Sequence, residues 1–277
     1  MTKLLLGLIG AGIQRSLAPA LHEEEGRHHG LRVHYQLIDV DAPEILPELV
    51  RAVRAIGFAG LNITYPFKQA VIPLLDSLAE EARAIGAVNT VVREGDRLVG
   101  YNTDGEGWSW GFKRALPGAD LSRVVLLGAG GAGSACADAV MRLGARQLLI
   151  VDQDASRAAG LAARLSLEFP GSRATAVREI GTAISGATGL IQATPVGMAG
   201  RPGIPLAEEL LRPSLWVSEV VYVPLETQLL KAARRIGCAT ADGGHMNVGQ
   251  AVRGFRLFTG CDADAARMES HFRKLVS

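Results

Sequence analysis

Cysteine, long apolar runs and membrane-spanning stretches are scarce in this chain of 277 residues. Its three cysteines, Cys136, Cys238 and Cys261, are odd in number and widely spaced, which predicts neither a disulfide framework nor a zinc motif. We therefore expect reduced thiols and a cytoplasmic location. The first twelve residues are too short to span a membrane and lack the cleavage pattern of a signal peptide. These absences argue against a secreted disulfide scaffold and an integral membrane protein.

An excess of charge of either sign is also missing. The 29 Lys and Arg residues nearly balance the 28 Asp and Glu residues, and the basic residues are scattered along the chain. Such a balance produces no overall field that would attract nucleic acid or an anionic membrane. The histidines show no metal-ligand spacing, so we expect no metal site. Hydrophobic residues at 48% indicate a globular protein, and the length suits two domains.

Apolar runs alternate with helical patterns, which is typical of the α/β class. In the first hundred residues we expect strands at 4–9, 33–37, 60–63 and 87–92, with helices at 19–29, 43–56 and 70–84. A polar joint at 101–107 precedes a second α/β series. There we expect helices at 108–116, 130–143, 156–167 and 247–259, with strands at 123–128, 147–152, 189–193, 216–221 and 239–241.

A glycine-rich segment connects the expected strand at 123–128 to the helix that follows it. Gly128, Gly130 and Gly133 form the pattern G-x-G-x-x-G. In that pattern the first glycine allows a tight turn, the second lets the backbone approach a pyrophosphate, and the third lets helix and strand pack closely. The helix N-terminus offers N–H groups to phosphates. We predict a dinucleotide-binding loop that comprises Gly128, Ala129, Gly130, Gly131, Ala132 and Gly133.

An acidic residue at the end of the next strand indicates which dinucleotide binds. Asp152 follows Gly133 by 19 residues, close to the spacing at which a carboxylate accepts hydrogen bonds from the adenosine ribose. The same carboxylate would repel a 2′-phosphate, so we expect NAD rather than NADP. Arg157 is a second candidate contact to the cofactor, although its place at the start of a helix equally fits a solvated helix face.

Polar residues follow the strands of the first half. Asn62 ends a strand, Thr64 lies in the following loop, and we expect Lys68 near the start of a helix. Asn89 and Asp104 belong to two further polar clusters. Ligands of α/β sheets bind beyond the carboxyl ends of strands. Amides suit a polyol, and a Lys beside an Asp suits proton exchange with an alcohol during hydride transfer.

At these residues the chain resembles the shikimate dehydrogenase family, particularly its quinate/shikimate dehydrogenase branch. The resemblance covers nearly the whole chain and rests on eight motifs in the family's order. They are Ser16 to Pro19, Asn62-Ile63-Thr64-x-Pro66-x-Lys68, Gly86 to Thr90, Asn102-Thr103-Asp104-x-x-Gly107, the glycines of 128–133, Ala193 to Met198, Tyr222-x-Pro224-x-x-Thr227, and Asp242-Gly243 through Met246 to Gln250-Ala251.

The resemblance implies a role for each matching residue. Lys68 would transfer the proton at the carbinol, with Asp104 bonded to it and to the substrate. Asn62, Asn89 and Asp104 would bind ring hydroxyls. Contacts to the substrate carboxylate or nearby hydroxyls would come from Ser16, Thr64, Tyr222 and Gln250. The nicotinamide end would be lined by Thr194, Val196, Met198, Val220, Gly243 and Met246. The implied reaction converts shikimate or quinate and NAD⁺ to the 3-dehydro acid and NADH.

Two positions depart from the family's pattern. Ala18 stands where the family usually has a second hydroxyl residue, so one donor to the substrate carboxylate is missing. Loss of one hydrogen bond to a charged group costs roughly 1.5–3 kcal/mol, which corresponds to an affinity for shikimate about ten-fold or more weaker. The change is equally compatible with quinate, an amino analogue or a compensating residue elsewhere. Glu219 replaces an Asp that is common before the Tyr222 motif.

Together these features predict an α/β protein with an N-terminal substrate domain, a doubly wound Rossmann domain and a cleft between them. We place the substrate domain at 1–103 with 245–277 and the NAD domain at 104–244. The expected ligands are small molecules, and the expected state is a monomer or homodimer. Two rival hypotheses remain: a dehydrogenase of the same fold for another cyclic hydroxy or amino acid such as aminoshikimate, and a non-catalytic dinucleotide-sensing regulator.

Overall fold

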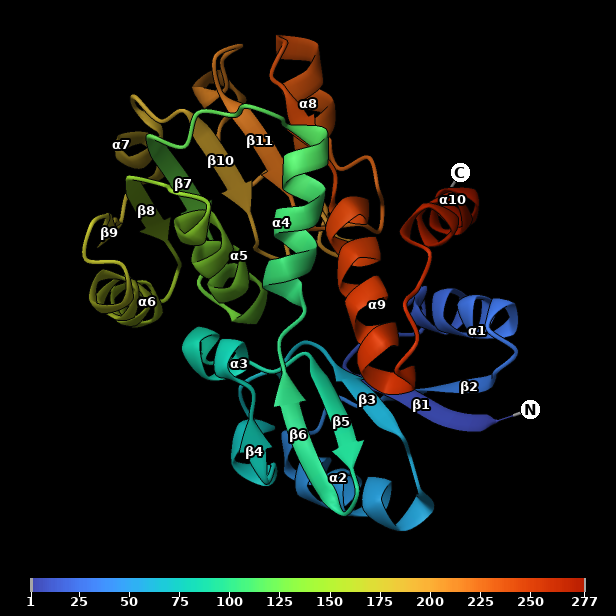
Figure 1. Ribbon diagram of the computed structural model, residues 1–277. Helices are drawn as coiled ribbons and strands as arrows, with labels where there is room; N and C mark the ends of the chain where they lie inside the picture. Colours follow the sequence, from blue (N-terminus) through green and yellow to red (C-terminus); the bar gives the residue numbers. More distant parts are fainter. Residues whose placement is uncertain (1, 277) are drawn as a thin grey trace. The chain divides into compact units, whose positions relative to one another are not determined.

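The computed structural model describes residues 2–276, which form two compact units. Unit 1 contains the residues up to Thr103 together with Gln250–Leu275, and unit 2 contains Asp104–Gly249. Each unit consists of one six-stranded sheet with its own helices (Figure 1). Both units therefore have the α/β architecture expected from the alternating pattern.

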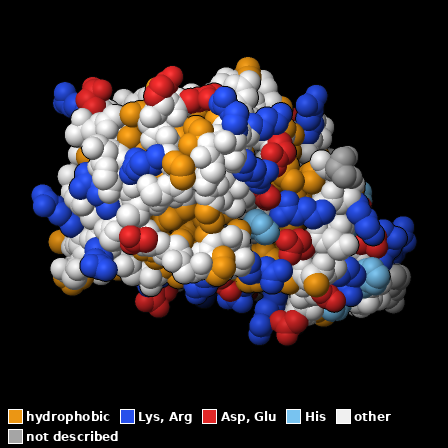
Figure 2. Space-filling model, turned by 90° about the horizontal axis from the view of Figure 1, so that it is seen from above, with side chains coloured by type: hydrophobic (Ala, Val, Ile, Leu, Met, Phe, Trp, Pro, Cys, Tyr) orange, Lys and Arg blue, Asp and Glu red, His pale blue; other side chains and the backbone are white. Residues whose placement is uncertain are grey.

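Charge of both signs is interspersed on the face of the molecule that Figure 2 shows. Figure 2 shows Lys and Arg side chains mixed with Asp and Glu side chains rather than gathered into one basic area. Across residues 2–276, no helix is both long enough and apolar enough to cross a membrane. The same residues contain no group of three or more His, Cys, Asp or Glu side chains that could bind a metal ion.

The sheet of unit 1 is mixed and has the strand order β2-β1-β3-β5-β6-β4. Its strands are β1 (Lys3–Gly10), β2 (Arg32–Asp39), β3 (Gly60–Ile63), β4 (Ser77–Leu78), β5 (Thr90–Glu94) and β6 (Arg97–Tyr101). The β2, β1 and β3 strands are parallel, whereas β5 is antiparallel to both β3 and β6. Its helical elements are α1 (Ala18–His28), the 3₁₀ turn Pro43–Ile45, α2 (Leu46–Ile56), the 3₁₀ turn Ile72–Leu74, α3 (Glu80–Ile85), the end of α9 (Gly243–Thr259) and α10 (Ala265–Val276).

Both faces of β1 are buried, which explains its nearly continuous apolar sequence. Leu6 and Leu8 belong to one hydrophobic cluster, with Tyr35 and Phe258. Ile9 points to the opposite face and belongs to a second cluster that includes apolar residues of α2. Because side chains alternate along a strand, this single run contributes to two cores.

The segment 70–84 is not the helix that its apolar pattern predicted. It contains a turn, a 3₁₀ turn, the short strand β4 and the start of α3. Pro73 is the fourth residue of this segment, and a proline at that position removes a helical hydrogen bond and clashes with the preceding turn. The β6 strand was also not predicted. It pairs with β5 across a two-residue Gly95-Asp96 turn, in which Gly95 has a φ of +64°.

The sheet of unit 2 is entirely parallel and has the order β12-β11-β10-β7-β8-β9. Its strands are β7 (Arg123–Leu127), β8 (Gln147–Val151), β9 (Arg173–Ala176), β10 (Gly189–Gln192), β11 (Trp216–Glu219) and β12 (Thr240–Ala241). Counted from β7, this is the order 3-2-1-4-5-6 of dinucleotide-binding folds. Its helical elements are α4 (Asp104–Ala115), α5 (Gly131–Arg142), α6 (Ala155–Glu168), α7 (Ile180–Ile184), the 3₁₀ turn Glu208–Leu210, α8 (Gln228–Ile236) and the start of α9. We had not predicted β9, α7, α8 or, in unit 1, α10.

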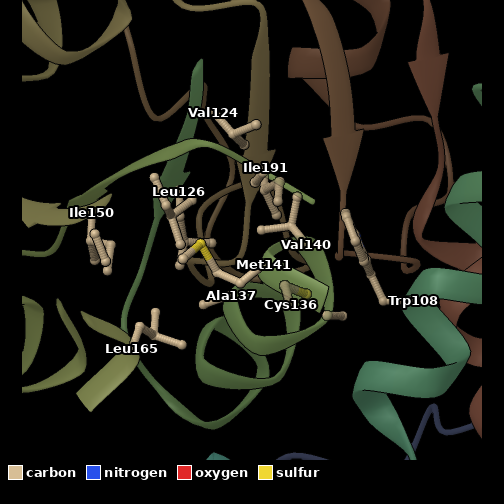
Figure 3. Packing of buried hydrophobic residues seen from close by; sticks show 14 of the residues in the cluster. Trp108, Val124, Leu126, Cys136, Ala137, Val140, Met141, Ile150, Leu165 and Ile191 are labelled. Atoms are coloured by element: carbon tan, nitrogen blue, oxygen red, sulfur yellow. The ribbon is translucent and has the colours of Figure 1, made fainter. Parts of the chain in front are cut away.

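Alternate residues of β7 face two separate cores in unit 2. Val124 and Leu126 pack with the apolar face of α5, including Val140 and Met141 (Figure 3). Val125 and Leu127 belong to a second cluster on the other face of the sheet. The sheet is therefore covered on both sides by apolar side chains.

An ion pair between the buried Glu25 and the half-buried Arg267 attaches the C-terminal helix α10 to α1 within unit 1. Glu25 is 1% exposed and accepts hydrogen bonds from Arg267 Nε at 2.8 Å and Nη2 at 2.6 Å. The backbone N–H of Asp264 donates to the same carboxylate at 2.8 Å. Burial alone would raise the pKa of Glu25, but these hydrogen bonds and the Arg267 charge outweigh it and lower the pKa.

We predict that Arg267→Met lowers the free energy of unfolding by about 3 kcal/mol, because it leaves a buried carboxylate without its counter-charge. Arg256→Met is the matched control, since Arg256 pairs with Asp262 at the surface and such pairs contribute under about 1 kcal/mol. Urea unfolding at neutral pH measures both variants. Equal losses in the two variants would contradict a stabilising role for the buried pair.

Candidate active site

The loop after β3 carries Lys68 on a well-anchored turn of unit 1. The Thr64 N–H donates to Ile9 O at 3.0 Å, and Lys68 O accepts from the Val88 N–H at 2.8 Å. Phe67, next to Lys68, is buried in the core. Lys68 therefore lies in a turn rather than at the predicted start of a helix, because its carbonyl bonds to Val88 instead of to a following helical turn.

The end of β1 lies directly against this loop. A Cβ atom added at Gly10 would be 2.2 Å from Thr64 Cγ2, which is closer than two carbon atoms approach. Ala11 N–H also donates to Tyr65 O at 2.9 Å. Glycine at position 10 therefore allows the loop of Thr64 and Lys68 to approach β1.

Asn62 and Asn89 are brought together in a buried hydrogen-bond network. Asn62 Nδ2 donates to Asn89 O at 3.2 Å and to Thr90 Oγ1 at 3.1 Å, while Asn62 Oδ1 accepts from the Tyr35 hydroxyl at 2.7 Å. Asn89 Oδ1 in turn accepts from Thr103 N–H at 2.8 Å. Both hydrogens of the Asn62 amide are thus used within the protein, which leaves only an acceptor position on Oδ1 for a ligand hydroxyl.

His22 packs behind this network. Its ring stacks on Tyr35 with centroids 5.2 Å apart, and neither ring nitrogen has a partner among the described residues. Burial lowers the pKa of His22 to about 4, so the ring is neutral at physiological pH. A Cβ added at Gly254 of α9 would lie 3.9 Å from Asn62 Nδ2. Gln250 precedes Gly254 by one helical turn and shares that face of α9.

The other predicted substrate residue of unit 1 lies before α1. Ser16 is half-buried, and its hydroxyl oxygen accepts from the Ala18 N–H at 3.3 Å. Ala18 is partly buried against the core cluster of Leu6, Leu8 and Tyr35. The methyl group at position 18 therefore packs with apolar side chains, and no hydroxyl replaces the missing donor within this segment.

In unit 2, the three positions of the G-x-G-x-x-G segment require glycine for different structural reasons. Gly128 has a φ of +95°, and a Cβ there would lie 2.8 Å from Ala193 O. A Cβ at Gly133 would lie 1.9 Å from Gly128 O. Gly130, by contrast, has an ordinary φ of −76°, and a Cβ there would meet no protein atom within 4 Å. Only Gly130 is left without a protein reason for being glycine, which fits a backbone that approaches a ligand.

Asp152, at the end of β8, is bonded to the glycine loop. Its Oδ2 accepts from Ala129 N–H at 2.6 Å, and its Oδ1 accepts from Asp154 N–H at 2.8 Å. Arg157 is exposed and pairs with Asp154 at 3.3 Å. Of these three charged side chains, two are carboxylates and one is a guanidinium, and the carboxylate of Asp152 contacts the loop directly.

Two loops and the start of α9 carry the residues predicted at the nicotinamide end. Thr194, Val196 and Val220 are half-buried, and Met198 is exposed. Tyr222, which was predicted to contact the substrate, is half-buried in the loop after β11. Gly243 begins α9 so close to β11 that a Cβ would lie 2.5 Å from Val220 O. Met246 is buried in the core of unit 2 and so contributes to packing.

Glu219 stabilises the loop that follows β11. Its carboxylate is 1% exposed and accepts from the N–H groups of Val220 at 2.9 Å and Val221 at 3.0 Å and from the Thr227 hydroxyl at 3.0 Å. Burial raises the pKa of Glu219 to about 7 in spite of these hydrogen bonds. Its bonding role, and those of Gln192 and Tyr35, were missed because a single polar residue in an apolar strand gives no periodic signal.

The two residues predicted to exchange the proton belong to different units. Lys68 is half-buried in unit 1, whereas Asp104 is buried and opens α4 in unit 2.

The strand order of unit 2 and its glycine loop define a protein of the two-unit α/β dinucleotide-binding class. The model of the shikimate dehydrogenase substrate binding domain matches residues 8–91. The shikimate dehydrogenase (NADP⁺) of Streptomyces avermitilis is 55% identical over 278 residues, covering 98% of this chain and 96% of that protein. The quinate dehydrogenase of Corynebacterium glutamicum, solved in complex with NAD, is 44% identical with a TM-score of 0.90, covering 99% of this chain and 100% of that one.

A third relative has both kinds of ligand. The shikimate 5-dehydrogenase of Thermus thermophilus, solved with NADP(H) and shikimate, has a TM-score of 0.86 and 35% identity, covering 98% of this chain and 99% of that one. The chain belongs to the shikimate dehydrogenase family, and it is an oxidoreductase.

We predict that Glu219→Gln becomes more stable relative to the wild type as pH rises. The folded state holds the Glu219 proton up to a pKa of about 7, whereas the unfolded state loses it near 4.5, the ordinary pKa of a Glu side chain. Stability contributed by this proton is complete below pH 4.5 and is lost as pH rises towards 7. The difference in free energy of unfolding between Glu219→Gln and the wild type should change by up to about 3 kcal/mol over this pH range. Urea unfolding across the range measures this difference, with the exposed Glu44→Gln as the control. A difference that does not depend on pH would refute the prediction.

Proposed function

We propose that this protein oxidises shikimate, quinate or both to the 3-dehydro acid with NAD⁺, and that Lys68 and Asp104 handle the proton. The observation that carries the proposal is the cluster at the end of β3, where an anchored Lys68 follows the buried amide network of Asn62 and Asn89. Amide and hydroxyl groups suit a ring with several hydroxyls. Family membership supports the same substrate class.

In the proposed reaction unit 1 binds the acid, consistent with the match to a substrate binding domain. We propose the boundaries 1–103 with 245–277 for this domain and 104–244 for the cofactor domain. The glycine loop and Asp152 would hold NAD⁺, which would supply the hydride acceptor for the carbinol carbon. Lys68 accepts the hydroxyl proton, and Asp104 orients and stabilises the ammonium. Asn62 accepts a hydrogen bond from a ring hydroxyl through Oδ1.

Unit 2 fits the dinucleotide. The open space beside Gly130 and the N–H groups at the start of α5 form a site for the pyrophosphate. We propose NAD rather than NADP because Asp152 and Asp154 outnumber Arg157 next to the loop, and a 2′-phosphate would meet net negative charge. The relatives include proteins named for either cofactor, so local charge is the argument for this chain.

Ala18 favours one alternative within the same fold. Its methyl group supplies no hydrogen bond where the family usually has a hydroxyl, so another cyclic hydroxy or amino acid is the second candidate substrate. An amino analogue such as aminoshikimate belongs to this class. The dinucleotide-sensing hypothesis has no supporting observation beyond the glycine loop.

Steady-state kinetics with shikimate, quinate and an amino analogue, each with NAD⁺ and NADP⁺, test the proposal. We expect turnover of shikimate or quinate with a higher kcat/KM for NAD⁺. Lys68→Ala should lower kcat by about 10²–10⁴-fold, since it removes a general base. The dissociation constant for NAD⁺ should stay within about three-fold of the wild-type value. Lys113→Ala, at the exposed end of α4, is the control. NAD⁺ binding without turnover of any acid would favour the sensor, and an active Lys68→Ala would refute the assigned proton transfer.

The glycine loop gives a second test. Gly130→Ala should fold with an unchanged melting temperature, because the added methyl meets no protein atom within 4 Å. It should weaken NAD⁺ binding by about ten-fold or more, because the methyl occupies the space of the pyrophosphate. Gly160→Ala in α6, which also meets nothing within 4 Å, is the control. Calorimetric titration measures binding, and unchanged affinity in Gly130→Ala would place the dinucleotide elsewhere.

A further inference from the structure

Two buried polar side chains end neighbouring strands of unit 2. Gln192 is the last residue of β10, Glu219 is the last residue of β11, and the two are register partners. They are 0% and 1% exposed. Residues at the same register of parallel strands point to the same face, so the two side chains lie side by side beneath the loops that follow their strands.

Gln192 bonds to the loop after β10 through both ends of its amide. Its Oε1 accepts from Thr194 N–H at 3.1 Å and from the Thr194 hydroxyl at 3.0 Å. Its Nε2 donates to Thr194 O at 3.2 Å and to Val196 O at 2.8 Å. The side chain thereby fixes the backbone of Thr194 and Val196, two residues predicted at the nicotinamide end.

Glu219 does the same for the loop after β11. Its Oε1 accepts from the N–H groups of Val220 and Val221, and its Oε2 accepts from the Thr227 hydroxyl at 3.0 Å. Thr227 Oγ1 also caps α8 by accepting from Leu230 N–H at 3.2 Å. The carboxylate therefore joins both ends of the segment 220–227, which contains Tyr222.

The two loops contact each other and the glycine loop. Ala199 N–H donates to Val223 O at 3.0 Å, and Val220 N–H donates to Gln192 O at 3.0 Å. On the other side, the backbone at Ala193 approaches Gly128 so closely that a Cβ there would lie 2.8 Å from Ala193 O. A displacement of either loop would therefore be transmitted to the other loop and to the turn at Gly128.

We propose that Gln192 and Glu219 are positioning residues that set the relative placement of the nicotinamide-end loops, so that dinucleotide affinity and hydride transfer depend on their side-chain hydrogen bonds. This inference rests on the proposed dinucleotide function. Thr194 and Val220 are half-buried, so water could satisfy their N–H groups, and for these groups the buried amide and carboxylate are not needed merely to avoid unpaired donors. What they add is a defined loop geometry, and a misplacement of about 1 Å at a reacting group can cost about 100-fold in rate.

The test compares Gln192→Met, which keeps the size and removes the hydrogen bonds, with Thr227→Val and Thr227→Ser, of which only the second keeps the hydroxyl bonded to Glu219. Gln192→Met and Thr227→Val should each weaken NAD⁺ binding by about three-fold or more and lower kcat by about ten-fold, while KM for the acid changes less than about two-fold. Thr227→Ser should restore both values to near the wild type.

Ser218→Ala is the matched control. Ser218 precedes Glu219 by one residue and points to the opposite face of β11. The substitution removes the buried hydrogen bond that Trp108 Nε1 donates to Ser218 Oγ at 3.0 Å. It should lower the melting temperature as much as Gln192→Met while leaving NAD⁺ affinity and kcat unchanged.

If Gln192→Met and Ser218→Ala differ in neither NAD⁺ affinity nor kcat, or if Thr227→Ser behaves as Thr227→Val does, the positioning role is overturned. Calorimetric titration with NAD⁺ requires no turnover, so this outcome is distinct from failure of the proposed function, in which the wild type itself oxidises none of the acids.

Discussion

The edge of unit 2 that carries the glycine loop depends on close contacts between backbone segments. These segments approach each other so closely that no side chain fits between them. A Cβ atom added at Gly133 would lie only 1.9 Å from the Gly128 carbonyl oxygen. Gly128 itself lies against the Ala193 carbonyl. The start of α5 is thereby bound tightly to β7, and the loop after β10 to the glycine turn. Gly128 and Gly133 make these close backbone contacts, whereas the space beside Gly130 stays open.

Polar strand-end side chains stabilise the same edge from within. Asp152, Gln192 and Glu219 end or follow three strands of the parallel sheet, and each bonds to backbone N–H groups of a loop. In unit 1 the equivalent device is the chain from Tyr35 through Asn62 to Asn89 and Thr103. Buried polar groups with all partners satisfied rigidify their surroundings, and both units use them where a ligand is proposed to bind.

Two local features of this chain bear on the proposed substrate and cofactor. The net negative charge next to the glycine loop is a direct electrostatic argument about the 2′-position of the dinucleotide. The apolar packing of Ala18 changes what the loop before α1 can donate to an acid. Relatives of closely similar structure carry names with different cofactors and acids, so the fold alone does not indicate which of them this chain uses.

The residue pattern alone determined the elements whose signal is local. The apolar run of β7, the glycines at 128–133 and the acid at 152 predicted a strand, turn, helix and following strand where the structure has them. The order of polar motifs identified the family, because each motif is a short contiguous segment. Segments with conflicting local signals were misjudged: the apolar spacing of 70–84 indicated a helix, and Pro73 with the pairing of β4 to β6 prevented it.

Only the tertiary structure decided which side chains meet. The pairing of Gln192 with Glu219, 27 positions apart in the chain, follows from the register of β10 and β11. The contact of Tyr35 with Asn62 likewise depends on which strands lie in one sheet and on which core packs behind them. The pKa of Glu219 follows from burial among groups distant in the sequence, and burial is a property of the packed chain rather than of any segment.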